Sequence, residues 1–139
     1  MGARTKARKR ALDILFEAEQ RGVEARIVYL RVATDATAAL NPYVETLVDG
    51  VAADRDRIDE LIATYSEGWS LDRMPAVDRN LLRIAVFELL HSVDVPANVI
   101  IDEAVSLASD LSTDDSPSFV NGILGRIAGL VPRLTDARE

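Results

Sequence analysis

Apolar side chains in this sequence recur at steps of three and four residues, which is the spacing of an amphipathic α-helix. One stretch, from Val77 to Leu90, is apolar almost all round. Such a helix belongs at the centre of a domain, with other helices packed about it. One of its stripes nevertheless mixes charge with apolar groups: Arg79, Arg83, Val86 and Leu90. Because a core seldom accepts arginine, we expect this stripe to be either ordinary surface or a docking site for another macromolecule.

The same spacing predicts helices before the central one. The first covers residues 5–21 and is ended by Gly22, and its core stripe contains Phe16. A second, less regular helix covers residues 24–36. Asn41-Pro42, a cap residue followed by proline, opens a long amphipathic helix that we expect to run unbroken to about Ser66.

Two further helices are predicted after the central one. One follows the turn at residues 95–98 and ends near Leu111, and the last opens at Ser116-Pro117, where Ser116 is the expected cap. Within the last helix, Gly122 and Gly125 are three residues apart, and we interpret them as a place of close helix–helix approach. Pro132 is expected to end the ordered structure.

Trp69 begins the linker before the central helix. Burial between two halves of the molecule is favoured for it over stacking on a ligand. The pattern as a whole predicts an all-α fold with the apolar helix at its centre. We expect a single domain over 1–139, divided into 1–68 and 69–139.

The composition narrows the class of protein. Seven Gly, five Pro and no hairpin dipeptide between alternating strands favour helices. Cysteine is absent, which excludes disulfides and thiol-ligated metals and fits a reducing compartment. No apolar run approaches 18 residues and no cleavable leader is recognisable. We therefore expect a soluble, cytoplasmic protein with no membrane contact.

Charge is unevenly distributed along the chain. The net charge is −7, yet the first ten residues hold five basic residues and no acid, so the other 129 carry −12. The basic residues are Arg4, Lys6, Arg8, Lys9 and Arg10. We expect them to reach past the packed body, where they serve either solubility or contact with the phosphates of a polyanion.

Catalytic machinery is not recognisable. There is no phosphate-binding glycine loop, nucleophile elbow or metal-spaced cluster. The lone His91 lacks a partner for catalysis, and the paired acids sit on charged helical surface or in loops: Asp54 with Asp56, Asp102 with Glu103, and Asp114 with Asp115. We expect a binding module that is not an enzyme and uses no cofactor or metal.

Four segments, in order, resemble the NusB family of bacterial transcription antitermination factors. They span almost the full length: the basic start running into Ala11–Phe16, Val77–Arg79 with Leu82–Leu89, Asp94–Pro96 with Ile101–Val105, and Phe119–Leu124. The resemblance implies an all-α fold of about seven helices, as two small helical bundles packed about a central apolar helix. It implies binding to single-stranded boxA RNA in ribosomal-RNA leader transcripts. It also implies a small-subunit ribosomal protein, acting as NusE, as partner within the transcribing RNA polymerase complex.

Site residues follow from the resemblance by position. For RNA they are the five basic residues, with Phe119 for base stacking and Phe16, Asp115 and Asn121 as further candidates. For the partner protein they are Asp78, Arg79, Leu82, Arg83 and Val86. Thr5 and Ala7 dilute the basic start relative to denser runs in the family, which implies weaker RNA affinity.

Two other functions stay open on the sequence alone. The chain could be a helical scaffold that binds only protein, with its basic start serving solubility. It could also be a detached RNA-binding domain of a ribosomal-RNA cytosine methyltransferase, although it ends before any methyl-donor-binding domain could begin. A homodimer through exposed Val86 and Leu90, or through the acidic body and the basic start, is a further possibility.

Overall fold

The computed structural model describes residues 2–131, and that part of the chain contains helices and loops but no strand. The elements are α1 (Ala3–Arg21), α2 (Ala25–Asp35), α3 (Pro42–Ala53), α4 (Arg55–Tyr65), the short 3₁₀-helix η1 (Leu71–Arg73), α5 (Ala76–His91), α6 (Ala97–Leu111) and α7 (Ser116–Ala128). The predicted all-α fold of about seven helices is confirmed. The expectation about Pro132 lies outside the described residues.

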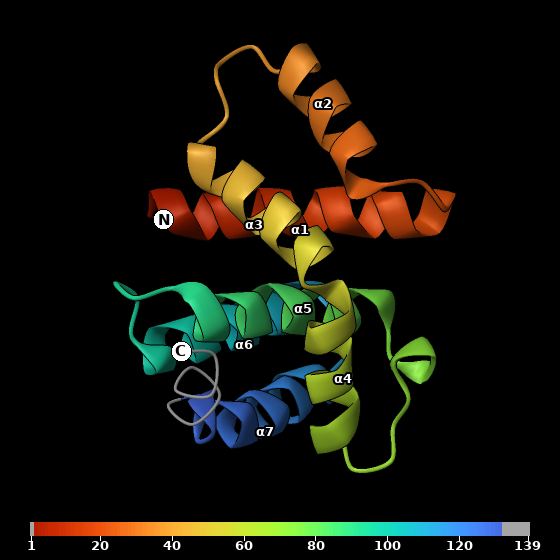
Figure 1. Cartoon of the computed structure of the whole chain (residues 1–139), viewed down its shortest axis with the longest axis vertical. Coiled ribbons are helices and arrows are strands. Elements are labelled where there is room, and N and C mark those ends of the chain that lie inside the picture. The colour runs from red at the N-terminus through yellow and green to blue at the C-terminus, as the bar shows by residue number, and fades with distance from the viewer. Residues whose placement is uncertain (1, 132–139) are drawn as a thin grey trace.

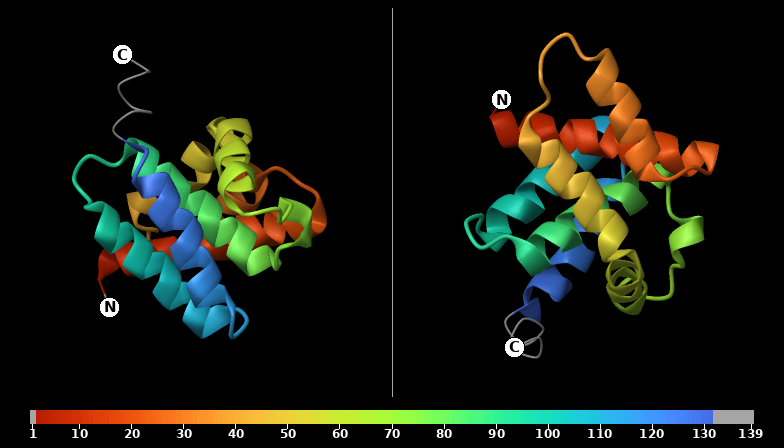
Figure 2. Two further views of the ribbon diagram at one scale, coloured as in Figure 1. Left: turned by 90° about the horizontal axis from the view of Figure 1, so that it is seen from below. Right: turned by 45° about the horizontal axis from the view of Figure 1, so that its top comes forward.

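The central helix of the molecule is α5. It contacts α1, α3, α4, α6 and α7, and all but a few of its side chains are buried. In Figure 1, α1–α3 form the upper part of the molecule and α4–α7 the lower part. Seen from below, α7 lies across α6 and α5 (Figure 2, left). Residues 77–90, which are apolar almost all round, therefore form the central helix that their pattern predicts.

The prediction of one long helix from Pro42 to Ser66 is wrong, because the helix is interrupted at Asp54. There φ is −115° and ψ is 22°, so α3 ends and α4 starts in a new direction. The apolar spacing continues across the break, which is why the sequence pattern does not reveal it. The break lets α3 pack on α1 and α5 while α4 packs on α5 and α7.

Close helix–helix approach occurs at a different glycine from those predicted. Among residues 2–131, no neighbouring atom lies within 4 Å of a Cβ placed at Gly125, and the only such neighbour of Gly122 is Arg126 of the same helix, so that prediction is wrong. At Gly50 of α3, by contrast, a Cβ would lie 2.2 Å from the Phe87 ring of α5. The ring occupies the space that only glycine leaves open.

Helix ends agree in part with the signals in the sequence. Gly22 ends α1 with φ 66°, and the Asn41 side chain accepts a hydrogen bond from the amide of Tyr43 at the start of α3. Ser116, however, does not cap α7 from outside. It is the first residue of that helix, and its buried hydroxyl donates to Asp78 Oδ2 over 2.8 Å.

One side chain of α1 differs from its predicted place. Leu12 and Leu15 are buried, but Phe16 is 38% exposed and therefore does not belong to the core stripe. Within residues 2–131, none of the helices combines the length and apolar character needed to span a membrane.

Candidate functional site

The five basic side chains at the start of α1 differ sharply in their surroundings. Arg8 is only 4% exposed, so the expectation that all five reach past the body is wrong at this residue. Arg8 donates two hydrogen bonds of 2.8 Å to the Glu88 carboxylate of α5 and one of 3.2 Å to Glu103 of α6. The Tyr43 hydroxyl donates a further bond of 2.7 Å to Glu88.

Arg8 is therefore part of the internal structure. Burial alone lowers the pKa of its guanidinium, but the hydrogen bond and charge of Glu88 outweigh burial, and the pKa is raised. A guanidinium held in this way by two carboxylates is not available to a phosphate. Its predicted contact with RNA loses its physical basis.

Two of the remaining cations are exposed but paired. Arg4 donates to Asp94 over 2.9 Å and lies over the Tyr43 ring, and Lys9 pairs with Asp13 one turn further along α1. Exposed pairs of this kind contribute little and exchange readily with other anions. Arg4 and Lys9 can therefore still contact a phosphate.

Lys6 and Arg10 are the free cations of α1. Both are exposed, and neither has an ion pair or hydrogen-bond partner for its side chain among residues 2–131. They lie one helical turn apart on the wall of a hollow of about 370 Å³, which the loop 36–41 closes on the other side. We call Lys6 and Arg10 the basic face of α1.

The residues predicted to contact a partner protein lie inside the molecule. Four of the five are buried, and Arg79 is nearly so: the five are Asp78, Arg79, Leu82, Arg83 and Val86. The expectation that their stripe lies at the surface is wrong, and Leu90 is buried as well. A homodimer through Val86 and Leu90 therefore lacks an accessible surface.

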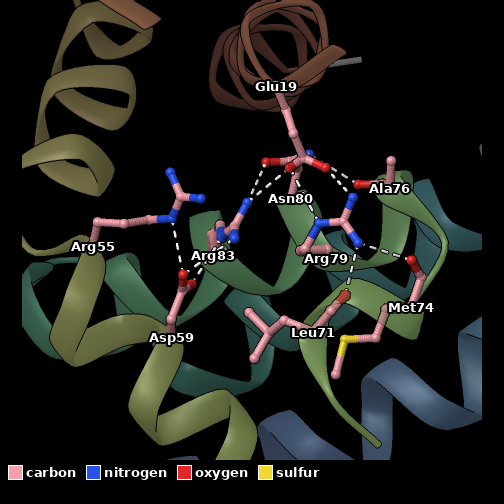
Figure 3. Close-up of polar contacts among 9 residues, drawn as sticks. All are labelled: Glu19, Arg55, Asp59, Leu71, Met74, Ala76, Arg79, Asn80 and Arg83. Carbon is pink, nitrogen blue, oxygen red and sulfur yellow. Dashed lines mark hydrogen bonds and ion pairs between the residues drawn. The ribbon is translucent and has the colours of Figure 1, made fainter. Parts of the chain in front are cut away.

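Carboxylates from two other helices neutralise the two arginines of this stripe (Figure 3). Arg79 and Arg83 both bond to Glu19 of α1, and Arg83 also bonds to Asp59 of α4, with distances of 2.8 and 3.1 Å to its two oxygens. Arg79 donates as well to the carbonyl oxygens of Leu71 and Met74, which anchors the η1 segment. The network joins α1, α4 and η1 to α5.

Glu19 is the shared acceptor of that network. Burial alone raises the pKa of its carboxyl, but the hydrogen bonds and charge of Arg79 and Arg83 outweigh this, so the pKa is lowered below 4.5. The sequence offered no signal for this role, because nothing distinguishes Glu19 from the other acids of α1. Its partners come from a helix 60 residues later.

An exposed pair of rings forms a second feature of the surface. Trp69 is 55% exposed, so the prediction that it is buried between two halves is wrong. Its ring meets that of Phe119 edge to face, with centroids 6.4 Å apart and planes at 69°. The two rings line a hollow of about 340 Å³ together with Arg73, Met74 and Asp115. We call it the ring hollow.

The other predicted RNA residues are accessible. Phe119 is half-buried, and Asp115 and Asn121 are exposed near the start of α7. Asp78, beneath the ring hollow, is buried and accepts hydrogen bonds from Ser112 and Ser116, with distances of 2.5 and 2.8 Å. Among residues 2–131 there is no group of three or more His, Asp or Glu side chains that could hold a metal.

An all-helical fold that presents unpaired cations and exposed rings defines a class of small helical binding proteins. Within that class, the chain belongs to the NusB family, whose family model matches residues 5–129. This confirms the resemblance found in the sequence.

Relatives in this family are similar over nearly the whole chain. The transcription antitermination protein NusB of Saccharopolyspora erythraea is 58% identical over 136 residues, which cover 96% of this chain and 92% of the relative. That of Nocardioides sp. is 54% identical and covers 96% of this chain and 99% of the relative.

Solved structures agree with the fold. T. maritima NusB matches with a TM-score of 0.84 and 34% identity, covering 99% of this chain and 98% of that one. A chain from the complex of the antitermination factors NusB and NusE with dsRNA matches with a TM-score of 0.82 and 26% identity, covering 93% of this chain and 98% of that one.

Proposed function

We propose that this protein is a transcription antitermination factor of the cytoplasm that binds boxA-type single-stranded RNA in ribosomal-RNA leader transcripts. In this role it acts with a small-subunit ribosomal protein, NusE, in the transcribing RNA polymerase complex. The observation that carries the proposal is the family: relatives above 50% identity are transcription antitermination proteins, and one solved relative is bound to NusE and RNA. The proposed activity is binding rather than catalysis.

The basic face of α1 supports phosphate binding. Lys6 and Arg10 are exposed and unpaired among the described residues, so an RNA phosphate meets no competing carboxylate on either side chain. Each cation that neutralises a phosphate releases counterions, which makes affinity fall with salt. Arg4 and Lys9 can add to this once an RNA displaces their exposed acids.

Exposed side chains elsewhere support contacts with bases. Phe119 and Phe16 offer accessible ring surface, and Asn121 and Asp115 offer hydrogen-bonding groups close to Phe119. Bases of a single strand can be splayed out and stacked on such rings. Because four of the predicted partner-protein residues are buried and Arg79 is nearly so, we do not propose direct partner contacts for them.

The double variant Lys6→Ala/Arg10→Ala tests the proposal. We expect weaker binding to a 12-nucleotide single-stranded boxA RNA, and a slope of log affinity against log salt that is shallower by about 1.4, or about 0.7 for each lost contact. The measurement is a filter-binding or gel-shift titration at several salt concentrations, with and without the ribosomal protein.

The matched control is Arg31→Ala, which removes an exposed cation of α2 and should leave the slope unchanged. An unchanged slope in the double variant would exclude the basic face as the phosphate site. If the unaltered protein retained no RNA even at low salt yet bound the ribosomal protein, the chain would be a scaffold that binds only protein.

A further inference from the structure

Trp69 and Arg73 are two surface residues near Phe119 that neither the sequence pattern nor the family resemblance assigns to RNA. Trp69 precedes η1, and Arg73 is its last residue. Arg79 holds this short segment through the carbonyl oxygens of Leu71 and Met74. This anchoring fixes the main chain beneath them. Their side chains remain exposed.

The rings of Trp69 and Phe119 meet edge to face, as a corner, rather than stacking face to face. With planes at 69° and centroids at 6.4 Å, Trp69 and Phe119 already touch each other, so no third ring fits between them. A flat group in the ring hollow can stack on the face of one ring and meet the edge of the other, which are the favoured aromatic arrangements. The hollow, at about 340 Å³, is open to solvent and large enough for a nucleobase.

The ring hollow differs in charge from a second hollow on the other side of the two rings. The second hollow, of about 270 Å³, contains Arg126, but that guanidinium is held by Glu67 and by the Tyr65 carbonyl oxygen. Arg73 in the ring hollow has no side-chain partner among residues 2–131. Of these two hollows, therefore, only the ring hollow offers an anion a cation that is unpaired among the described residues.

The two carboxylates of the ring hollow differ in their hydrogen-bond partners. The Asp78 carboxylate is occupied by the hydroxyls of Ser112 and Ser116. The Asp115 carboxylate is exposed and has no side-chain partner within residues 2–131, so it can accept hydrogen bonds from N–H groups. A nucleotide combines what these groups recognise, namely a flat ring, N–H donors on its edge and a phosphate.

We propose that the ring hollow binds one unstacked nucleotide of the single-stranded RNA, with its base on the Trp69–Phe119 corner and its phosphate on Arg73. This inference rests on the proposed RNA-binding function and extends it to two residues. Because Glu19, near the end of α1, is bonded to Arg79 just after η1, the ring hollow lies toward the opposite end of α1 from Lys6 and Arg10.

Trp69 is the only tryptophan of the chain, so its fluorescence reports on this site alone. We expect the 12-nucleotide boxA RNA to quench it in parallel with binding measured by gel shift. Trp69→Ala should weaken binding roughly 5- to 150-fold, which is the effect of one lost base–ring contact, and Trp69→Phe should restore part of it. Arg73→Ala should reduce the salt slope by about 0.7.

The controls are Ile27→Ala and Arg31→Ala, a matched apolar and cationic pair of exposed residues on α2, at the opposite end of the molecule in Figure 1. Both should bind RNA as the unaltered protein does. Circular dichroism checks that every variant is folded, which we expect because the Trp69 ring is exposed.

Three outcomes would overturn the inference. If RNA binds with its usual salt slope but neither quenches Trp69 nor responds to Trp69→Ala, the ring hollow is not a nucleotide site, while the proposed function stands. Quenching by the ribosomal protein without RNA would assign the hollow to that protein. If the unaltered protein binds no RNA at all, the proposed function and this inference fail together.

Discussion

Gly50 is the residue at which helix packing leaves no room for a side chain. The Phe87 ring occupies the space where a Cβ would lie, and that ring also stacks on His91, with centroids 4.9 Å apart. Moving Phe87 would therefore disturb both the contact between α3 and α5 and the end of α5. Gly125, in the exposed face of α7, has no such neighbour in the part of the chain that the structure describes.

Two glycine substitutions should consequently have opposite effects. Gly50→Ala is expected to lower the free energy of unfolding by about 1–3 kcal/mol, since overpacking exceeds the gain in helix propensity. Gly125→Ala is expected to raise it by about 0.5–1 kcal/mol, because only the propensity term applies. Urea denaturation of both variants measures the two changes. A stabilised Gly50→Ala would contradict the packing argument.

At the same scale, the sequence could not tell which arginines and lysines are free. Helical spacing assigns a residue to a face of its own helix, but whether a carboxylate meets it depends on a helix that arrives much later in the chain. Arg8 is buried because Glu88 and Glu103 lie opposite it, whereas Lys6, two residues earlier, faces solvent. Composition shows the charge of this segment but not its partners.

At the scale of elements, the network of Glu19, Arg79, Arg83 and Asp59 holds three helices in place. Such a network stabilises only while its carboxylates are ionised, because a protonated carboxyl no longer neutralises two guanidinium groups. The lowered pKa of Glu19 sets the direction of the pH dependence. A carboxyl whose pKa is lower in the folded state contributes stability above its unfolded-state value, and this stability is lost as the pH falls through the folded-state value.

Glu19→Gln should accordingly destabilise the protein by about 1.5–3 kcal/mol at pH 7, the range for hydrogen bonds to charged groups. The difference from the unaltered protein should shrink as the pH falls from the ordinary pKa of a glutamate carboxyl through the lowered pKa of Glu19, where the carboxyl becomes protonated in the folded protein as well. Urea titrations at neutral and acidic pH measure both effects. Glu60→Gln, which alters an exposed carboxylate of α4, is the control; an equal loss there would contradict the role assigned to Glu19.

The break between α3 and α4 shows where prediction of elements ends. The apolar residues on either side of Asp54 keep one helical period, so a continuous helix is the simplest interpretation of the pattern. What breaks the helix is the placement of its two parts against different neighbours. Helix existence follows from local spacing, while helix direction depends on tertiary packing.

At the scale of the whole molecule, α5 and the two buried ionic networks connect the parts of the chain predicted as 1–68 and 69–139. Arg8 of α1 is bonded to α5 and α6, and Glu19 of the same helix is bonded to α5. The division at residue 68 remains a prediction, and α4 contacts α5 and α7 as well as α3. The all-α class and the central helix could be predicted, because both depend on apolar periodicity alone.

Unfolding should therefore be a single cooperative transition. We expect Trp69 fluorescence, which reports on the region around η1 and α7, to change at the same urea concentration as far-UV circular dichroism, which reports on all helices. Two separated transitions would indicate that the halves unfold independently. Hydrogen exchange of the amides of α1 and α7 provides a second measurement.

The burial of Arg8 within α1 has a practical consequence for experiments on the basic N-terminal segment. Deleting the first ten residues would remove Arg8 along with Lys6 and Arg10. The buried Glu88 carboxylate would then keep the Tyr43 hydroxyl as its one hydrogen-bond donor among the described residues. A shortened protein that failed to retain RNA would thus report misfolding as readily as lost affinity. Point substitutions that spare Arg8 are the cleaner way to separate the two.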